Sequence, residues 1–296
     1  MTDNKAAIAV RHEAEDAAAL FPALLVEAER IAHTVNAGLH GRRRAGPGET
    51  FWQHRAYAFG DPVSAIDWRQ SARVSDRLYV RENEWEAAAA VYLWRDPSAS
   101  LHYTSSNQTP VKARRAEVLA TALAILLSQA GERIGLLGQE RRPFHGRGAP
   151  ARVLEALLAD HEGASSTPPK AFLRSGARAV LFSDFFTDIE NLARSVEALS
   201  SDGVKGVLVQ ICDPAEEDFP FAGRVEFQDL ESKDRLIFGE TASLRSDYQA
   251  AFTAHRQALS NLVANTGWNL ITHRTDKPAQ SALLALYAAL SDSRTV

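Results

Sequence analysis

The chain has 296 residues, 33 of them basic and 37 acidic, and 45% are hydrophobic, which is typical of a globular protein and excludes disordered and fibrous classes. A formal net charge of −4 gives no general attraction to nucleic acid, and a single cysteine, Cys212, excludes a disulfide framework and a thiolate metal site. Residues 1–21 carry charges throughout, and no stretch reaches the roughly 18 apolar residues of a membrane helix, so we expect a cytoplasmic protein without a signal peptide or membrane span.

The first part of the chain predicts helices followed by an antiparallel β extension. Residues 12–40 carry apolar side chains at helical spacing and end before Gly41, which predicts one or two helices. Residues 50–59 and 76–86 alternate aromatic or branched residues with polar ones, as antiparallel strands do. Part of the long segment that joins them is expected to form a short helical turn.

From residue 87 onward, apolar strands alternate with helices of ten or more residues, which is the signature of a parallel α/β sheet. Strands are predicted within residues 87–96, 132–139, 177–184, 204–213, 224–231 and 268–276, the fifth of them as an edge strand. Helices are predicted at residues 111–131, 150–161, 188–203, 244–267 and 278–290. The predicted domains are a helical segment at 1–40, the β extension at 41–86 and the α/β domain at 87–296.

Acidic and hydroxyl side chains follow two of the predicted buried strands. Residues i, i+2 and i+4 of an extended segment point the same way, so Asp96, Ser98 and Ser100 would present a carboxylate and two hydroxyls together. Asp184 ends another buried strand, and the carboxyl edge is where open α/β sheets bind ligands. This all-oxygen set favours Mg²⁺ or Mn²⁺. The alternative is that the two aspartates only cap the helices that follow them.

The arginine- and tryptophan-rich β extension is a second candidate site. Arginine and tryptophan are favoured at protein interfaces, so this segment could be a docking face for a partner. The alternative is that its acids and arginines form buried ion pairs between the two strands, with Trp68 packed beneath them. Nucleic acid is not expected as a partner, because the basic excess is small and three glutamates follow it. The candidate partner-binding residues are Arg55, Asp61, Asp67, Trp68, Arg73 and Arg81.

Several motifs in the chain resemble those of the domain of unknown function 58 family. They are GPGETF at 46–51, R-x-Y-x-x-G-D at 55–61, IDW at 66–68, SAR at 71–73, LYVRE at 78–82, DPSAS at 96–100, LFSDF at 181–185 and CDPAEEDFPF at 212–221. DPSAS followed by a strand that ends in SD also resembles the metal-ion-dependent adhesion site of von Willebrand factor A domains.

The resemblance implies a von Willebrand A-like Rossmannoid fold, with a mostly parallel sheet flanked by helices and preceded by the helical segment and the β extension. It also implies a role as an adaptor or chaperone-like partner of a MoxR-type AAA+ ATPase, acting on an unidentified client protein, with no established enzymatic activity. Adhesion sites of this type use a threonine from a third loop, and the corresponding residues 145–152 contain none.

Together these expectations describe a non-catalytic protein-interaction module. A divalent ion held by Asp96, Ser98, Ser100 and Asp184 would leave one coordination position open for an acidic side chain of the partner. The enzyme alternative uses the same edge for Mg²⁺-dependent phosphoryl transfer or hydrolysis, but it needs a nucleophile or a positioned base that the sequence does not offer. A third alternative leaves the metal site empty and assigns all binding to the β extension.

Overall fold

The computed structural model describes residues 26–33, 51–58, 66–73, 77–83, 90–139, 142–159, 165–228, 230, 235–239, 241 and 244–292. The chain divides into two compact units. The larger unit comprises Met1–Arg43 and Ala90–Val296, and the smaller unit comprises Arg44–Ala89.

The smaller unit is built on the predicted antiparallel strand pair. Strand β1 (Phe51–Ala56) pairs with β2 (Tyr79–Asn83), and the expected helical turn between them is α2 (Trp68–Ser71). The Ser71 hydroxyl donates to the Asp67 carbonyl at 2.7 Å and accepts from the Tyr79 amide at 2.9 Å, so it ties α2 to β2. Trp68, in contrast, is 61% exposed. The alternative in which Trp68 packs beneath the strands is therefore wrong on this point, because it is Ser71 that α2 turns toward β2.

The larger unit contains a sheet of five parallel strands in the order β4-β3-β5-β6-β9. These strands are β3 (Ala90–Arg95), β4 (Arg133–Leu136), β5 (Arg178–Ser183), β6 (Lys205–Cys212) and β9 (Asn269–Arg274). The chain winds outward from β3 to β4 and then returns past β3 to β5, so the direction of winding reverses between β3 and β5. The predicted parallel α/β fold is confirmed.

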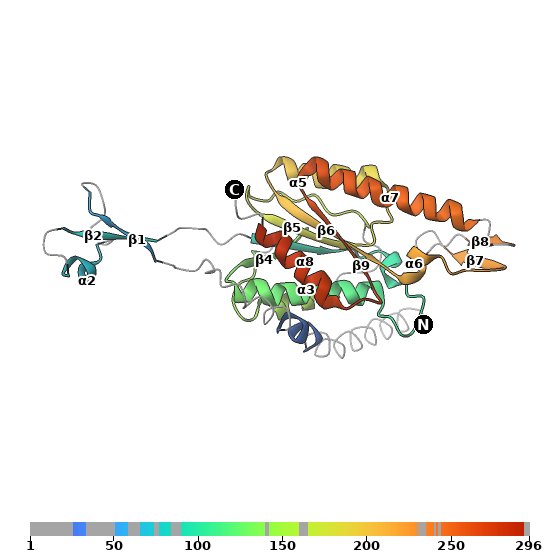
Figure 1. Ribbon diagram of the computed structural model, residues 1–296, viewed down its shortest axis with the longest axis horizontal. Helices are drawn as coiled ribbons and strands as arrows, with labels where there is room; N and C mark the ends of the chain where they lie inside the picture. Colours follow the sequence, from blue (N-terminus) through green and yellow to red (C-terminus); the bar gives the residue numbers. More distant parts are fainter. Residues whose placement is uncertain are drawn as a thin grey trace, which may run out of the picture. The chain divides into compact units, whose positions relative to one another are not determined.

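Helices cover both faces of this sheet, as Figure 1 shows. One face carries helix 26–33, α3 (Lys112–Gln129), α4 (Ala149–Leu158) and α8 (Ala279–Asp292), and the other carries α5 (Ile189–Ser201) and α7 (Leu244–Thr266). Helix α3 is buried along most of its length, because the sheet, α4, α8 and helix 26–33 surround it. No helix in the described ranges is long and apolar enough to cross a membrane.

Four elements of the larger unit differ from the sequence-based expectation. The predicted edge strand forms β7 (Val225–Gln228), which pairs with β8 (Arg235–Phe238) in a separate antiparallel sheet. It leaves the central sheet because the Phe227 ring packs on Phe219 and Phe221 instead. A short helix, α6 (Pro214–Asp218), and a 3₁₀ turn, η2 (Ala99–His102), were not expected.

Candidate functional site

The two predicted strand-end aspartates lie at the point where the winding of the sheet reverses. Asp96 follows β3 and Asp184 follows β5, and these strands are neighbours. The Asp96 amide donates to the Phe182 carbonyl at 2.9 Å, which extends the pairing of β3 with β5 beyond the strand end. Both aspartates are 1% exposed. The carboxyl ends of strands at such a reversal are where open α/β folds bind ligands.

Asp96 organises the turn that carries the two serines. Its Oδ1 accepts a hydrogen bond from the Ser98 amide at 2.8 Å, and its Oδ2 accepts one from the Ser183 hydroxyl at 2.5 Å. The hydroxyl oxygens of Ser98 and Ser100 are 3.0 Å apart. The sequence predicts one extended segment over residues 96–100. The structure differs, because the 3₁₀ turn η2 begins at Ala99. The turn, rather than strand alternation, brings the serines together.

The chemistry and spacing of these three side chains suit a hard cation. Two neighbouring oxygen ligands of an octahedral Mg²⁺, each about 2.1 Å from the ion, stand about 3.0 Å apart. The hydroxyls of Ser98 and Ser100 have that separation, which is also that of a hydrogen bond. Burial raises the pKa of Asp96, and the hydrogen bonds from Ser183 and Ser98 offset this only in part. Within the described ranges no cation forms an ion pair with Asp96, so its carboxylate is buried without a countercharge.

Asp184, the fourth predicted ligand, is already paired with a lysine that the sequence did not single out. Lys112 is 1% exposed, and its Nζ donates to Asp184 Oδ2 at 2.7 Å and to Glu216 Oε1 at 2.5 Å. Burial lowers the pKa of Lys112, but the charges of Asp184 and Glu216 raise it further and leave it above its ordinary value. A metal ion bound directly to Asp184 would therefore compete with an ammonium group held inside the protein.

The motif CDPAEEDFPF positions Glu216 through a helix cap. Asp213 caps α6 by accepting from the Ala215 amide at 2.9 Å, and the Glu216 carboxylate accepts from the Asp213 amide at 2.7 Å. This reciprocal arrangement is a capping box, and it fixes the first turn of α6. Glu216 thereby faces Lys112 across the end of the sheet. Its pKa is raised by burial, with the Lys112 charge opposing the shift.

A pocket of about 360 Å³, which we call the aromatic pocket, adjoins these residues. Ser100 and Lys112 both line it, so it is continuous with the end of the sheet. The Phe219 and Tyr248 rings are 4.6 Å apart, and those of Phe221 and Phe227 are 5.3 Å apart. Its aromatic lining residues are Tyr103, Phe186, Phe219, Phe221, Phe227 and Tyr248.

The predicted partner-binding residues of the β extension are described only in part. Trp68 and Arg73 are exposed, and Asp67 is half-buried and accepts a hydrogen bond from the Arg69 amide at 3.0 Å. For Arg55 in β1 and Arg81 in β2 the structure describes the backbone pairing but not the side chains. Asp61 lies outside the described residues. Their role in binding stays a prediction.

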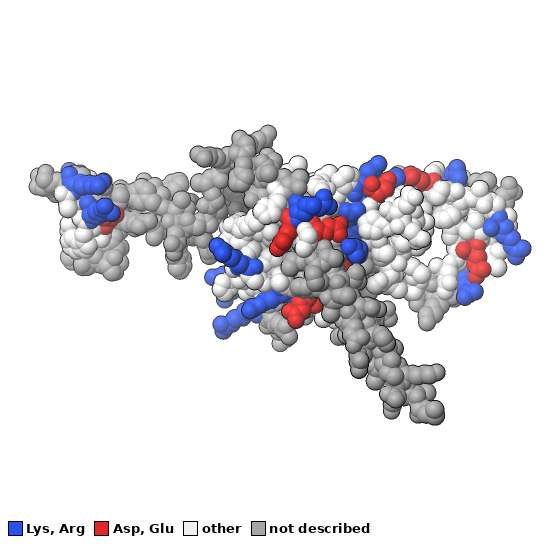
Figure 2. Space-filling view, turned by 90° about the horizontal axis from the view of Figure 1, so that it is seen from below, with Lys and Arg blue, Asp and Glu red and all other residues white. Residues whose placement is uncertain are grey.

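On the face shown in Figure 2, basic and acidic side chains of the larger unit are interleaved. Within the larger unit, Arg274 pairs with Asp218 at 3.0 Å and with Asp276 at 3.0 Å. The expectation that nucleic acid is not a partner stays a prediction.

Comparison with known proteins places the chain in a family. A family model described as "Protein of unknown function DUF58" matches residues 53–258. The uncharacterized proteins Rv1480 of Mycobacterium tuberculosis (strain ATCC 25618 / H37Rv) and Mb1516 of Mycobacterium bovis are each 28% identical over 265 residues, covering 83% of this chain and 82% of the relative.

Two solved structures share a weaker likeness. An aerotolerance-related membrane protein from Bacteroides fragilis is 12% identical with a TM-score of 0.42, and the conserved hypothetical protein BatB from Bacteroides thetaiotaomicron is 10% identical with a TM-score of 0.39. Each alignment covers 69% of this chain and 99% of the other. The family match spans well over half of the chain, including every residue of the candidate site, and the protein therefore belongs to the DUF58 family, as its motifs predicted.

Proposed function

We propose that this protein is a non-catalytic interaction module whose partner docks at the strand-end site, which we define as Asp96, Ser98 and Ser100 with the adjoining aromatic pocket. The observation that carries the proposal is the Asp96 carboxylate, which is 1% exposed and beside two hydroxyls but has no described cationic partner. A buried carboxylate without a countercharge is costly, and a bound cation would remove that cost.

In this proposal the cation is Mg²⁺ or Mn²⁺, held by Asp96, Ser98 and Ser100. Asp184 adds negative charge beside the ion, and it becomes a direct ligand only where the ion displaces Lys112 from it. The ion keeps a coordination position for an acidic side chain of the partner. An apolar side chain next to that acid would enter the aromatic pocket, which opens beside Ser100.

The resemblance that the motifs carry names the partner class, a MoxR-type AAA+ ATPase, and implies a von Willebrand A-like fold and a client protein, and the charge pattern of the first residues predicts a cytoplasmic setting. We propose these for this chain as well. The β extension would supply a second docking face, since Trp68 is 61% exposed and tryptophan is favoured at interface hot spots.

The reactive side chains near the end of the sheet support a non-catalytic role. Burial raises the pKa of the Cys212 thiol to about 12, so the thiolate needed for nucleophilic attack does not form at neutral pH. Lys112 is held in its charged form by two carboxylates and cannot act as a base. The enzyme alternative therefore still lacks a nucleophile or base among these groups.

The proposal is tested by measuring the affinity of the full-length chain for a purified MoxR-type ATPase, with Mg²⁺ and with EDTA. We expect EDTA to abolish binding and Asp96→Ala to weaken it at least about tenfold, or about 1.4 kcal/mol. Ser100→Ala should also weaken binding. Because Ser100 is only half-buried, this variant keeps the test valid if Asp96→Ala fails to fold. Asp188→Ala, which removes the exposed cap of α5, is the matched control and should bind normally.

Binding that survives EDTA and Asp96→Ala but fails in Trp68→Ala would overturn the strand-end site and assign recognition to the β extension. Phosphoester turnover that disappears in Asp184→Asn would instead support the enzyme alternative.

A further inference from the structure

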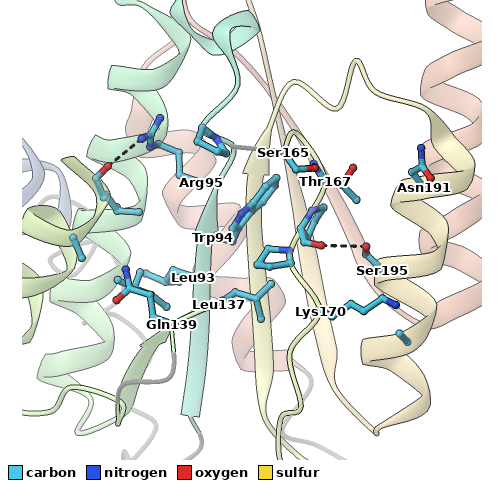
Figure 3. Close-up of a pocket in the computed structure, with 18 of the residues that line it drawn as sticks. Leu93, Trp94, Arg95, Leu137, Gln139, Ser165, Thr167, Lys170, Asn191 and Ser195 are labelled. Carbon is cyan, nitrogen blue, oxygen red and sulfur yellow. Dashed lines mark hydrogen bonds between the residues drawn. The ribbon is translucent and has the colours of Figure 1, made fainter. Parts of the chain in front are cut away.

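A second and larger cavity, of about 840 Å³, lies beyond the carboxyl ends of β3 and β4, as Figure 3 shows. Helices α4 and α5 and residues 165–170 form its other walls. None of Asp96, Ser98 and Ser100 lines it, so it is separate from the strand-end site. Its volume falls within the range of about 300–1,000 Å³ that is usual for small-molecule sites.

The walls of this cavity are held in place by specific contacts. The Ser195 hydroxyl of α5 donates to the Pro168 carbonyl at 3.2 Å, which ties residues 165–170 to the helix (Figure 3). The same residues 165–170 also contact the chain that follows β4. Gly138 there has φ +83°, and a Cβ on it would come within 2.6 Å of Pro169. The chain after β4 therefore packs on Pro169 as closely as a glycine permits, and the cavity is formed before any ligand enters.

The described lining of the cavity carries positive charge and no acidic side chain. Its cations are Arg95, Lys170 and Arg194. Arg194 donates to the Asn191 side-chain oxygen and, at 3.4 Å, to the Glu190 carbonyl, both of them uncharged acceptors. Because the whole chain has a formal charge of −4, this concentration of positive charge does not follow from composition.

Arg95 lines the inner wall of the cavity, but its polar atoms are already engaged. The residue is 4% exposed, and its guanidinium donates to the Leu157 carbonyl at 3.0 Å and to the Asp96 carbonyl at 3.3 Å. Its buried Nε makes no hydrogen bond but forms an ion pair with Glu117 at 3.9 Å. Lys170 and Arg194, which are both exposed, are therefore the cations of the lining that a ligand can reach.

The rest of the lining is apolar. Trp94 and Leu137 are each 6% exposed and form part of the cavity floor with Pro168. In Figure 3 the Trp94 ring lies between Arg95 on one side and Lys170 on the other. A ligand that matches this arrangement has an anionic group for the cations and an apolar group for the floor.

We propose that this cavity binds a small molecule carrying a phosphate or carboxylate group on an apolar, ring-sized body. A protein segment suits the site less well, because the volume of the cavity matches a small molecule, whereas protein interfaces are broad surfaces of about 800 Å² per partner. The inference does not rest on the proposed function, since no residue of the strand-end site lines this cavity.

The proposal is tested by titrating the ¹⁵N-labelled full-length chain with phenyl phosphate, benzoate and, as the uncharged counterpart, benzyl alcohol. We expect saturable shifts of the Trp94 indole and Gly138 amide signals with one or both anions and weaker binding of benzyl alcohol. The comparison of the two anions identifies which acid the site prefers.

Two kinds of variant separate charge from shape. Lys170→Ala/Arg194→Ala should weaken anion binding at least about tenfold, whereas Arg174→Ala, an exposed arginine outside the lining, should leave it unchanged. Ala198→Phe, at an exposed position of α5 that lines the cavity, should block binding without loss of charge. The proposal is overturned if the wild-type signals do not shift saturably, if benzyl alcohol binds as tightly as the anions, or if neither variant changes the affinity.

Discussion

Lys112 is among the largest fully buried side chains of the described structure, and it determines how the end of the sheet is charged. Lys112 is the first residue of α3. It pairs with Asp184, which follows β5, and with Glu216, which lies in the first turn of α6. Two carboxylates share one ammonium group, so this cluster keeps an excess of negative charge. Burial raises the pKa of the neighbouring Tyr103, and the charges of Asp213 and Glu216 raise it further.

Replacing Lys112 by methionine is expected to destabilise the protein by about 3 kcal/mol, because removing one partner of a buried ion pair leaves uncompensated charge. Urea unfolding of Lys112→Met measures this. Lys205→Met, at an exposed position of β6, is the control and should change little. The double variant Lys112→Met/Asp184→Asn should recover part of the loss. A cost below about 1 kcal/mol for the single variant would show that the pair is not buried as described.

His273 in β9 predicts a distinct pH dependence of stability. Burial lowers its pKa to about 4, with the Arg115 charge acting in the same direction, whereas an unfolded histidine titrates near 6.5. The folded state therefore resists protonation that the unfolded state accepts. The contribution of His273 is complete above pH 6.5 and declines as the pH falls to about 4, by about 3 kcal/mol in total.

The difference between wild type and His273→Gln isolates this effect from the titration of the carboxylates. The free energy of unfolding of the wild type should fall more steeply between pH 6.5 and 4 than that of the variant. His145→Gln, at an exposed position, should behave as the wild type does. Parallel curves for the wild type and His273→Gln would contradict the assignment.

The sequence was sufficient to find Asp96, Ser98 and Ser100, because the motif DPSAS is local and follows a recognisable strand. It was not sufficient to find Lys112 or Glu216. Asp184 and Glu216 follow Lys112 in the chain by 72 and 104 residues. Only the packing of α3 and α6 at one end of the sheet brings the three side chains together. From the sequence alone, a lysine at the start of an apolar helix is expected to be exposed to solvent.

At the scale of elements, β6 packs closely against the segment that precedes β9. A Cβ on Gly206 would come within 2.5 Å of the Trp268 ring and 2.7 Å of the Ala179 carbonyl oxygen. Trp268 is 4% exposed, and its Nε1 donates to the Val204 carbonyl at 3.0 Å. The indole therefore lies against β6 where only glycine leaves room for it.

Gly206→Ala is expected to lower the free energy of unfolding by about 1–3 kcal/mol, because the added methyl group must displace either the indole or the neighbouring strand. Gly239→Ala is the matched control, since a Cβ there meets nothing within 4 Å. Thermal or urea unfolding compares the two. If Gly206→Ala is as stable as Gly239→Ala, the close contact between β6 and Trp268 is wrong.

Periodicity was a reliable guide to the elements of the central sheet and less reliable for β7. The alternation of strands with long helices is typical of parallel connections, and the five predicted strands that lie in the central sheet are indeed parallel. The pattern of residues 224–231 predicts a strand but does not say which strand it pairs with. That choice depends on the contacts of the Phe227 ring with Phe219 and Phe238, which leave no periodic signal in the sequence.

At the scale of the whole molecule, the formal net charge of −4 does not reveal that the larger unit has two sites suited to ligands of opposite charge. The strand-end site combines a buried carboxylate that pairs with no cation of the described ranges, two hydroxyls and an aromatic pocket. The cavity beyond β3 and β4 is lined by cations and no described acid. One end of the sheet is thus suited to a cation and an acidic partner, and the larger cavity to a small anion.

The central claim is that the strand-end site binds a hard divalent cation, and calorimetric titration of the full-length chain with Mg²⁺ and Mn²⁺ tests it most directly. We predict one saturable site in the wild type, an affinity at least about tenfold weaker in Asp96→Asn, and wild-type binding in Asp188→Asn. The absence of binding heat in a folded wild-type protein, or equal affinity in Asp96→Asn, would contradict the account.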